Sequence, residues 1–180
     1  VRNGISIGEA AAFALLERPD VARPGSIQML GAGESSDAYH MSAPHPQGLG
    51  ARMAMEAALR SANLTPGDID YVNLHGTATP ANDASEGRAV SALFGDRVRC
   101  NSTKGATGHT LGAAGAVEAI VCALALIDGR TPNSPGTQTL DLTIPICYQI
   151  RGGEARLVRA LSNSFGFGGS NCSLVLGLVE

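Results

Sequence analysis

The sequence predicts a layered α/β domain, and three observations lead to this fold class. Short apolar runs of strand length alternate with longer stretches whose apolar residues recur at helical spacing. Clusters of Gly, Pro, Asn and Asp separate these runs, as expected of turns between elements. The 180 residues are 44% hydrophobic and 16% charged, which suits one folded domain with its own core. Strands that alternate with helices form layered α/β domains.

The elements follow in order along the chain. The run Gly8–Glu17 is predicted as a helix or a buried strand, because its apolar pattern fits both. The predicted strands are Ser26–Gly33, Tyr71–His75, Val98–Asn101, and the pair Leu157–Ser162 and Cys172–Val179, joined by a tight Gly-rich turn. The predicted helices are Leu49–Ala62, a helix capped by Thr79 or Asn82 that runs to Phe94, and Thr110–Ile127, ended by Asp128 and Gly129. Glu86 is expected to reach back toward the cap of the second helix. Residues 37–46 and 131–145 are predicted loops.

Charge and targeting signals narrow the function classes. The net charge of -3 argues against nucleic acid as a partner. No basic stretch followed by an apolar core opens the chain, so we expect a cytoplasmic protein. The apolar stretch Leu111–Ile127 contains Glu118 and is short for a membrane span, so we expect a buried helix and no membrane. Val1 in place of an initiator Met indicates a fragment or a processed chain.

The four cysteines are far apart in the sequence and lie in mostly apolar contexts. A disulfide framework or a zinc site would need tighter clustering. Cys100, Cys122, Cys147 and Cys172 are therefore expected to be reduced, small core residues.

Three loops that follow predicted strands carry the reactive side chains: His75-Gly-Thr-Ala-Thr-Pro80, residues 101–109 and residues 163–171. In α/β sheets, ligands bind in the crevice beyond the strand ends. The glycines match neither the P-loop order nor the dinucleotide fingerprint. No metal is expected, since His75 and His109 lack partners at ligand spacing. Gly-x-Ser-x-Gly, typical of serine hydrolases, does not occur.

Together these loops resemble the C-terminal half of β-ketoacyl-[acyl-carrier-protein] synthases. The matching motifs are His-Gly-Thr-x-Thr-Pro, Ser-Thr-Lys-x-x-x-Gly-His and Asn-Ser-Phe-Gly-Phe-Gly-Gly-x-Asn, and Ser35-Ser-Asp-Ala-Tyr-His-Met41 resembles the KAS II branch. The resemblance implies a thiolase-like fold, with residues 1–180 forming the C-terminal layered α/β half with a mixed sheet. It also implies decarboxylative condensation of an acyl thioester with malonyl-acyl carrier protein, in fatty acid or polyketide synthesis. The nucleophilic Cys belongs to the absent N-terminal half, so we expect the isolated chain to be inactive in condensation.

The same resemblance assigns roles to individual residues. His75 and His109 are expected to hold the malonyl thioester carbonyl, and Lys104 to tune the site; a solvated surface lysine is the alternative for Lys104. Glu118 is expected to balance Lys104 or support the loops, and a purely structural core carboxylate is an equal alternative. The residues expected to bind substrate are Thr77 and Thr79, which would contact the phosphopantetheine arm, and Phe165, Phe167 and Gly168, with Phe167 gating the acyl pocket.

No cofactor is implied beyond the phosphopantetheine that the substrate carries on its carrier protein. The implied partners are the acyl carrier protein, the N-terminal half of the synthase, and a second subunit in a homodimer or heterodimer. Two alternatives stay open. One is a non-catalytic partner resembling chain-length factors, against which the retained His75, Lys104 and His109 argue. The other is a relative limited to decarboxylation or thiolysis.

Overall fold

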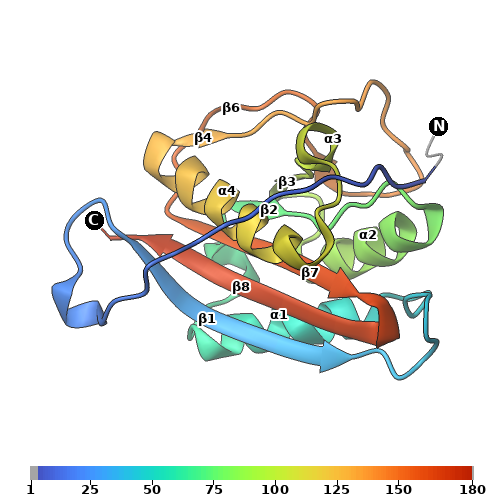
Figure 1. Ribbon diagram of the computed structural model, residues 1–180, viewed down its shortest axis with the longest axis horizontal. Helices are drawn as coiled ribbons and strands as arrows, with labels where there is room; N and C mark the ends of the chain where they lie inside the picture. Colours follow the sequence, from blue (N-terminus) through green and yellow to red (C-terminus); the bar gives the residue numbers. More distant parts are fainter. Residues whose placement is uncertain (1–3, 180) are drawn as a thin grey trace.

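The computed structural model describes residues 4–179 and shows a six-stranded mixed sheet with helices on both faces (Figure 1). The strand order is β1-β8-β7-β2-β3-β5. These strands are β1 (Ile27–Ser36), β2 (Tyr71–Asn73), β3 (Arg99–Asn101), β5 (Cys147–Tyr148), β7 (Arg159–Gly166) and β8 (Ser170–Leu178). β1, β8 and β7 run antiparallel, whereas β7, β2, β3 and β5 are parallel. The predicted α/β fold with a mixed sheet is confirmed.

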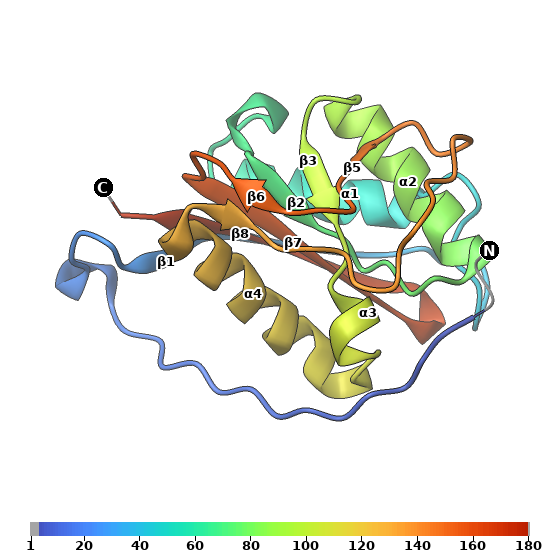
Figure 2. The same ribbon diagram turned by 90° about the horizontal axis from the view of Figure 1, so that it is seen from above.

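Two helices cover one face of the sheet and a third covers the other (Figure 2). Helices α1 (Leu49–Ser61) and α2 (Pro80–Phe94) pack on the first face around Met55, Val72 and Val90, all fully buried. Helix α4 (Ala114–Asp128) packs on the second face through Cys122 and Leu126. These positions agree with the predicted helices. Alternate β2 residues face the two cores, as the pleat of a strand requires.

Helix α1 lies unusually close to β1. A Cβ atom added at Gly33 would overlap the backbone of Ala54 and Ala58, and one added at Gly31 would lie 2.8 Å from the nitrogen of Ala62. Glycine is required at both strand positions because only a missing side chain allows this approach of two backbones.

Helix α4 is apolar on both sides but buried on only one. The stretch Leu111–Asp128 has a mean hydropathy of 1.9 and the length of a membrane span, and 28% of it is buried. Leu124 and Ile127 on the outer side are 52% and 55% exposed. The prediction of a buried helix is therefore wrong for the outer side of α4, where Leu124 and Ile127 remain exposed.

The N-terminal segment is neither of its predicted structures. Residues 8–17 form no helix and no strand; they run as an extended chain past α3 (Lys104–Thr107) and α4 (Figure 2). Phe13, Leu15 and Leu16 are 91%, 85% and 77% exposed. The apolar pattern predicted a buried element, but no described residue covers these three side chains. Val1 lies outside the described residues.

Further differences concern short elements. Helix α3 lies within a predicted loop, and the predicted helix from Thr110 starts with a 3-10 turn, Leu111–Ala113, before α4. The region after α4 contains β4 (Arg130–Thr131), which pairs with β6 (Gly153–Glu154) in a second, two-stranded sheet. β5 adds to the edge of the main sheet beside β3. Two-residue strands carry too little periodicity to be predicted from sequence.

Candidate functional site

The loops of His75 and of Lys104 and His109 meet at one edge of the sheet. The third predicted loop, residues 163–171, is wrong for most of its length, because these residues continue β7 and begin β8 and only the turn Phe167–Gly169 separates the two strands. β2, β3 and β7 are parallel, so their carboxyl ends lie together. His75 follows β2 by two residues, and Lys104 and His109 follow β3 in the α3 region. The predicted site residues His75, His109 and Lys104 are thereby brought together from distant parts of the sequence.

The loop of His75 is fixed by hydrogen bonds to the carboxylate of Glu86 on α2. The backbone N–H groups of His75 and Gly76 donate to Glu86 Oε1 and Oε2 at 2.8 and 2.9 Å. Asn163 Nδ2 on β7 also donates to Oε1, at 3.2 Å. The predicted role of Glu86 as part of the α2 cap is therefore wrong; Thr79 is the N-cap residue and makes no side-chain cap hydrogen bond. The carboxylate instead accepts hydrogen bonds from two backbone N–H groups of the loop that precedes the helix.

The rings of His75 and His109 lie edge to face. Their centroids are 5.2 Å apart and their planes meet at 84°. The ring of Phe165 lies 5.6 Å from that of His75. The backbone N–H of Leu111 donates to His109 Nδ1 at 3.3 Å. Since a backbone N–H can only donate, Nδ1 is the acceptor nitrogen and Nε2 carries the ring proton of neutral His109.

Lys104 and Glu118 form a buried ion pair beside the histidines. Lys104 Nζ donates to Glu118 Oε1, and the two side chains are only 6% and 2% exposed. The expectation that Lys104 is not a solvated surface residue is confirmed. Burial raises the pKa of Glu118 to about 7, against the opposing attraction of Lys104. The pair is thus a cation and an acid that share one desolvated site.

Both histidines are held in the neutral form. Burial lowers the pKa of His75 to about 2, with further contributions from the charge of Lys104 and from His109. Burial, followed by the charge of Lys104, also lowers the pKa of His109. At neutral pH the site therefore presents two uncharged imidazoles next to one buried cation.

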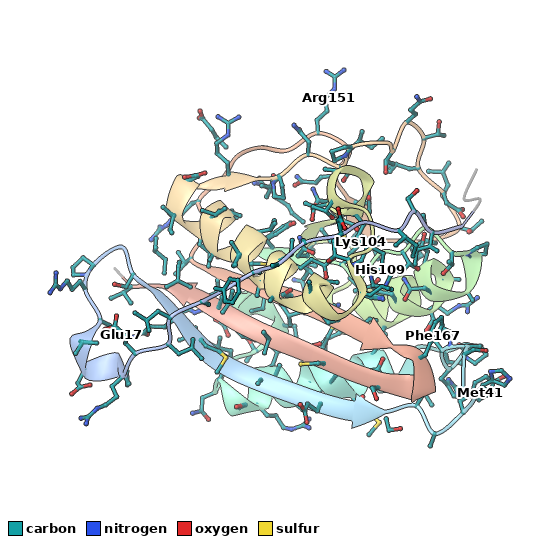
Figure 3. All side chains as sticks on the ribbon, in the orientation of Figure 1. Glu17, Met41, Lys104, His109, Arg151 and Phe167 are labelled. Carbon is teal, nitrogen blue, oxygen red and sulfur yellow. The ribbon has the colours of Figure 1, made fainter. Side chains whose placement is uncertain are left out.

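The expected substrate-binding residues are only partly close to this pair. Thr77 and Thr79 follow His75 and bring their hydroxyl oxygens to 2.8 Å of each other. Phe167, in contrast, is 84% exposed and lies at the β7–β8 turn, away from His109 and near Met41 (Figure 3). The N–H of Gly168, which has a φ of +82°, donates to the Met41 carbonyl at 2.8 Å. The structure does not bring the Phe167 ring to the histidines.

Two hollows flank the histidine pair. One, of about 460 Å³, is lined by both histidines, Phe165, Ser164 and Cys172. The other, of about 900 Å³, is lined by His109, Lys104, Thr77 and the apolar side chains Leu140, Ile144 and Tyr148. His109 borders both, so its ring forms part of the wall between them.

Three of the four cysteines carry thiols that burial makes less acidic. Burial raises the pKa of Cys100, Cys122 (to about 12) and Cys172 above the ordinary thiol value. Cys100 and Cys122 are buried as predicted, whereas Cys147 and Cys172 are only partly buried, so the prediction of four core cysteines is wrong for these two. Within residues 4–179, no group of three or more His, Cys, Asp or Glu side chains is placed to hold a metal ion.

Sequence reasoning missed two supports of the site, Asn163 and Leu111. Asn163 links Glu86 to β8, since it accepts from Ser173 Oγ at 2.7 Å while donating to Glu86. Leu111 has a φ of +53°, which aims its N–H at the His109 ring. A non-glycine residue in this conformation gives no signal in the sequence.

The fold and site together define an α/β domain with two neutral histidines and a buried cation at the ends of parallel strands. A family model described as "Beta-ketoacyl synthase, C-terminal domain" matches residues 27–138. This chain belongs to the β-ketoacyl synthase family and carries its C-terminal domain. The predicted resemblance is confirmed.

Individual relatives agree with this membership. 3-Oxoacyl-[acyl-carrier-protein] synthase 2 of Rhizobium meliloti is 44% identical over 97% of the chain and 43% of the relative. The mitochondrial 3-oxoacyl-[acyl-carrier-protein] synthase of Arabidopsis thaliana is 42% identical over 99% of the chain and 41% of the relative. A solved ketosynthase in complex with its chain length factor, from Xenorhabdus doucetiae, superposes with a TM-score of 0.82 and 47% identity, over 87% of this chain and 40% of that one. The chain thus spans less than half the length of these relatives.

Proposed function

We propose that this chain supplies the malonyl decarboxylation site of a synthase that condenses an acyl thioester with malonyl-acyl carrier protein. The observation that carries the proposal is the edge-to-face pair of neutral His75 and His109 beside the buried Lys104. The names of the relatives, 3-oxoacyl-acyl-carrier-protein synthases, support the reaction class.

The chemistry follows from the two imidazoles. In the proposed reaction the bond between the malonyl α-carbon and its carboxylate breaks, CO2 leaves, and the electron pair forms an enolate. His109 Nε2–H donates to the enolate oxygen, and His75 supplies the second donor. Neutral donors stabilise this developing charge without needing a proton transfer, and loss of one such donor typically lowers the rate by about 10²–10³. Lys104 adds positive charge nearby.

Condensation needs a further group. The enolate carbon attacks the carbonyl of an acyl thioester held on a cysteine, and the cysteine sulfur leaves as the new carbon–carbon bond forms. Raised thiol pKa values make Cys100, Cys122 and Cys172 poor nucleophiles. We therefore assign the nucleophile to another part of the synthase and expect no condensation by the isolated chain. Thr77 and Thr79 are the proposed contacts of the carrier's phosphopantetheine arm, and Phe167 the proposed gate.

A malonyl-carrier-protein decarboxylation assay on the complete synthase tests this proposal. His75→Ala and His109→Ala should each lower the rate of CO2 release by about 10²–10³. The matched control is His40→Ala, because His40 is exposed on the 37–46 loop. Wild-type rates in either site variant would refute the proposal.

The chain-length-factor alternative is weighed by the same assay. It has some support, because two of the similar solved structures are complexes of a ketosynthase with a chain length factor. A partner that only shapes the pocket would change product length in His75→Ala while leaving CO2 release unaltered. The neutral histidine pair favours the catalytic assignment.

A further inference from the structure

The backbone of His109 is held by a segment far from it in sequence. The N–H of His109 donates to the Ser6 carbonyl at 2.7 Å, and the His109 carbonyl accepts from the N–H of Gly8 at 3.1 Å. Ile7 and His109 thereby form an isolated parallel β-bridge. We call Ser6–Gly8 the strap. The dark blue extended chain that contains the strap crosses in front of α3 in Figure 1.

Two glycines allow this contact. A Cβ atom at Gly8 would overlap the carbonyl oxygen of Thr107, and one at Gly108 would lie 2.7 Å from the nitrogen of Gly8. Gly108 also has a φ of +68°, which side chains rarely tolerate. Each glycine therefore meets the backbone of the other strand, so a side chain at either position would separate the two segments.

The orientation of the His109 ring depends on the same stretch of backbone. Its Nδ1 accepts from Leu111, two residues along, so the direction of Nε2–H is fixed by the local chain. The strap binds this chain through both backbone polar groups of His109. Ile7 is 65% exposed, so the contact is made by the backbone and not by a buried side chain.

We propose that the strap is a positioning element for His109, which aligns the Nε2–H donor with the enolate oxygen. The role in catalysis rests on the proposed function of His109. Because a displacement of about 1 Å in a reacting group typically costs about 10²-fold in rate, a small shift of the bridge has a large effect. Ser6, Ile7 and Gly8 thus act on the reaction through His109, without touching substrate.

Nuclear magnetic resonance on the 180-residue chain tests whether the strap fixes the backbone and the ring of His109. In Gly8→Ala the His109 amide should exchange with solvent at least tenfold faster, and the imidazole nitrogen shifts should move from a single Nε2–H tautomer toward a mixture. Two controls should match wild type. Ile7→Ala keeps the backbone bridge, and Gly153→Ala adds a methyl group where no atom lies within 4 Å. Unchanged His109 exchange in Gly8→Ala would overturn the proposal.

The wild-type chain gives a test that does not depend on the folding of Gly8→Ala. The Gly8 amide donates to the His109 carbonyl and the His109 amide donates to the Ser6 carbonyl. Opening of the strap releases both amides together, so they should exchange at matching rates. A His109 amide that exchanges as fast as exposed loop amides contradicts the strap. In the complete synthase, Gly8→Ala should lower malonyl decarboxylation about 10–100-fold with acyl transfer to the enzyme unchanged. If His109→Ala leaves decarboxylation intact, the proposed function fails, while the exchange result still decides the strap.

Discussion

The ring of His109 meets the ring of His75 edge to face, with 5.2 Å between their centroids. Burial lowers the pKa of each ring, and the charge of the buried Lys104 lowers it further. A proton on either ring would place a second cation in a desolvated site. The pair therefore stays neutral over the physiological pH range and keeps its donors available without a change of charge.

The low pKa of His75 predicts a pH-dependent stability. Its pKa is about 2 in the folded chain against 6.5 ordinarily, so the unfolded state binds this proton more readily. The contribution is fully present above pH 6.5 and is lost as pH falls below that value. Between pH 7 and pH 5 the wild type should lose about 2 kcal/mol more unfolding free energy than His75→Gln. Urea denaturation at both pH values measures this. His40→Gln should behave as the wild type, and parallel curves for wild type and His75→Gln would contradict the assignment.

The buried pair of Lys104 and Glu118 should show strong coupling in a double-mutant cycle. Glu118→Gln leaves the buried ammonium without its partner, so we expect a loss of about 3–5 kcal/mol in unfolding free energy. The double variant Lys104→Met/Glu118→Leu should lose much less than the sum of the single changes. Additive losses in denaturation experiments would show that the two side chains act independently.

Lys104 is also the only lysine in the sequence, which gives a second measurement of the same pair. Apart from the N-terminal amine, an acylating reagent has one amine target, and in the wild type this target is buried. Mass spectrometry should show slow acylation of Lys104 in the wild type and faster acylation in Glu118→Gln. Arg52 and Glu56 form an exposed pair on α1, so Glu56→Gln should leave the Lys104 rate unchanged.

Glu86 should contribute to stability through the His75 loop. In Glu86→Gln one of the two backbone N–H groups, of His75 or Gly76, would face the amide NH2 and lose its acceptor. A buried unsatisfied donor costs about 1–3 kcal/mol. Thermal or urea unfolding measures the loss, and the amide shift of His75 reports whether the loop moves. Unaltered stability together with an unaltered shift would mean that these hydrogen bonds do not hold the loop.

The reactive residues were predictable because strand, loop and motif coincide. β2 and β3 are short strands that end just before the loops of His75 and Lys104, so the topology of a parallel sheet places both loops at one edge. The burial of Lys104 was expected from the resemblance of its motif, and its partner Glu118 lies one helix further along. Local pattern and the general rule for strand ends predicted where the loops lie, whereas the roles of their residues came from the resemblance to the synthase family.

The failures involve contacts between distant segments. A capping rule applied to Glu86 considers its own helix, whereas the carboxylate serves the loop before that helix and Asn163 on β7. The bridge between Ile7 and His109 leaves no trace except the glycines on each side. The run Gly8–Glu17 fits a buried element, yet Phe13, Leu15 and Leu16 remain exposed among the described residues.

The exposed apolar run suggests a final prediction, on association. Phe13, Leu15 and Leu16 expose large apolar side chains without supporting the described fold. Phe13→Ser/Leu16→Ser should therefore change the unfolding free energy by no more than about 0.5 kcal/mol. The same variant should reduce self-association of the chain, because exposed contiguous apolar surface drives association. Light scattering across a concentration series measures this, with Ala10→Ser/Ala14→Ser as the control for substitution in the same segment. A large loss of stability in the Phe13/Leu16 variant would mean that the segment packs on the domain. Equal scattering from both variants would place the associating surface elsewhere, and the outer side of α4 would be the next surface to test.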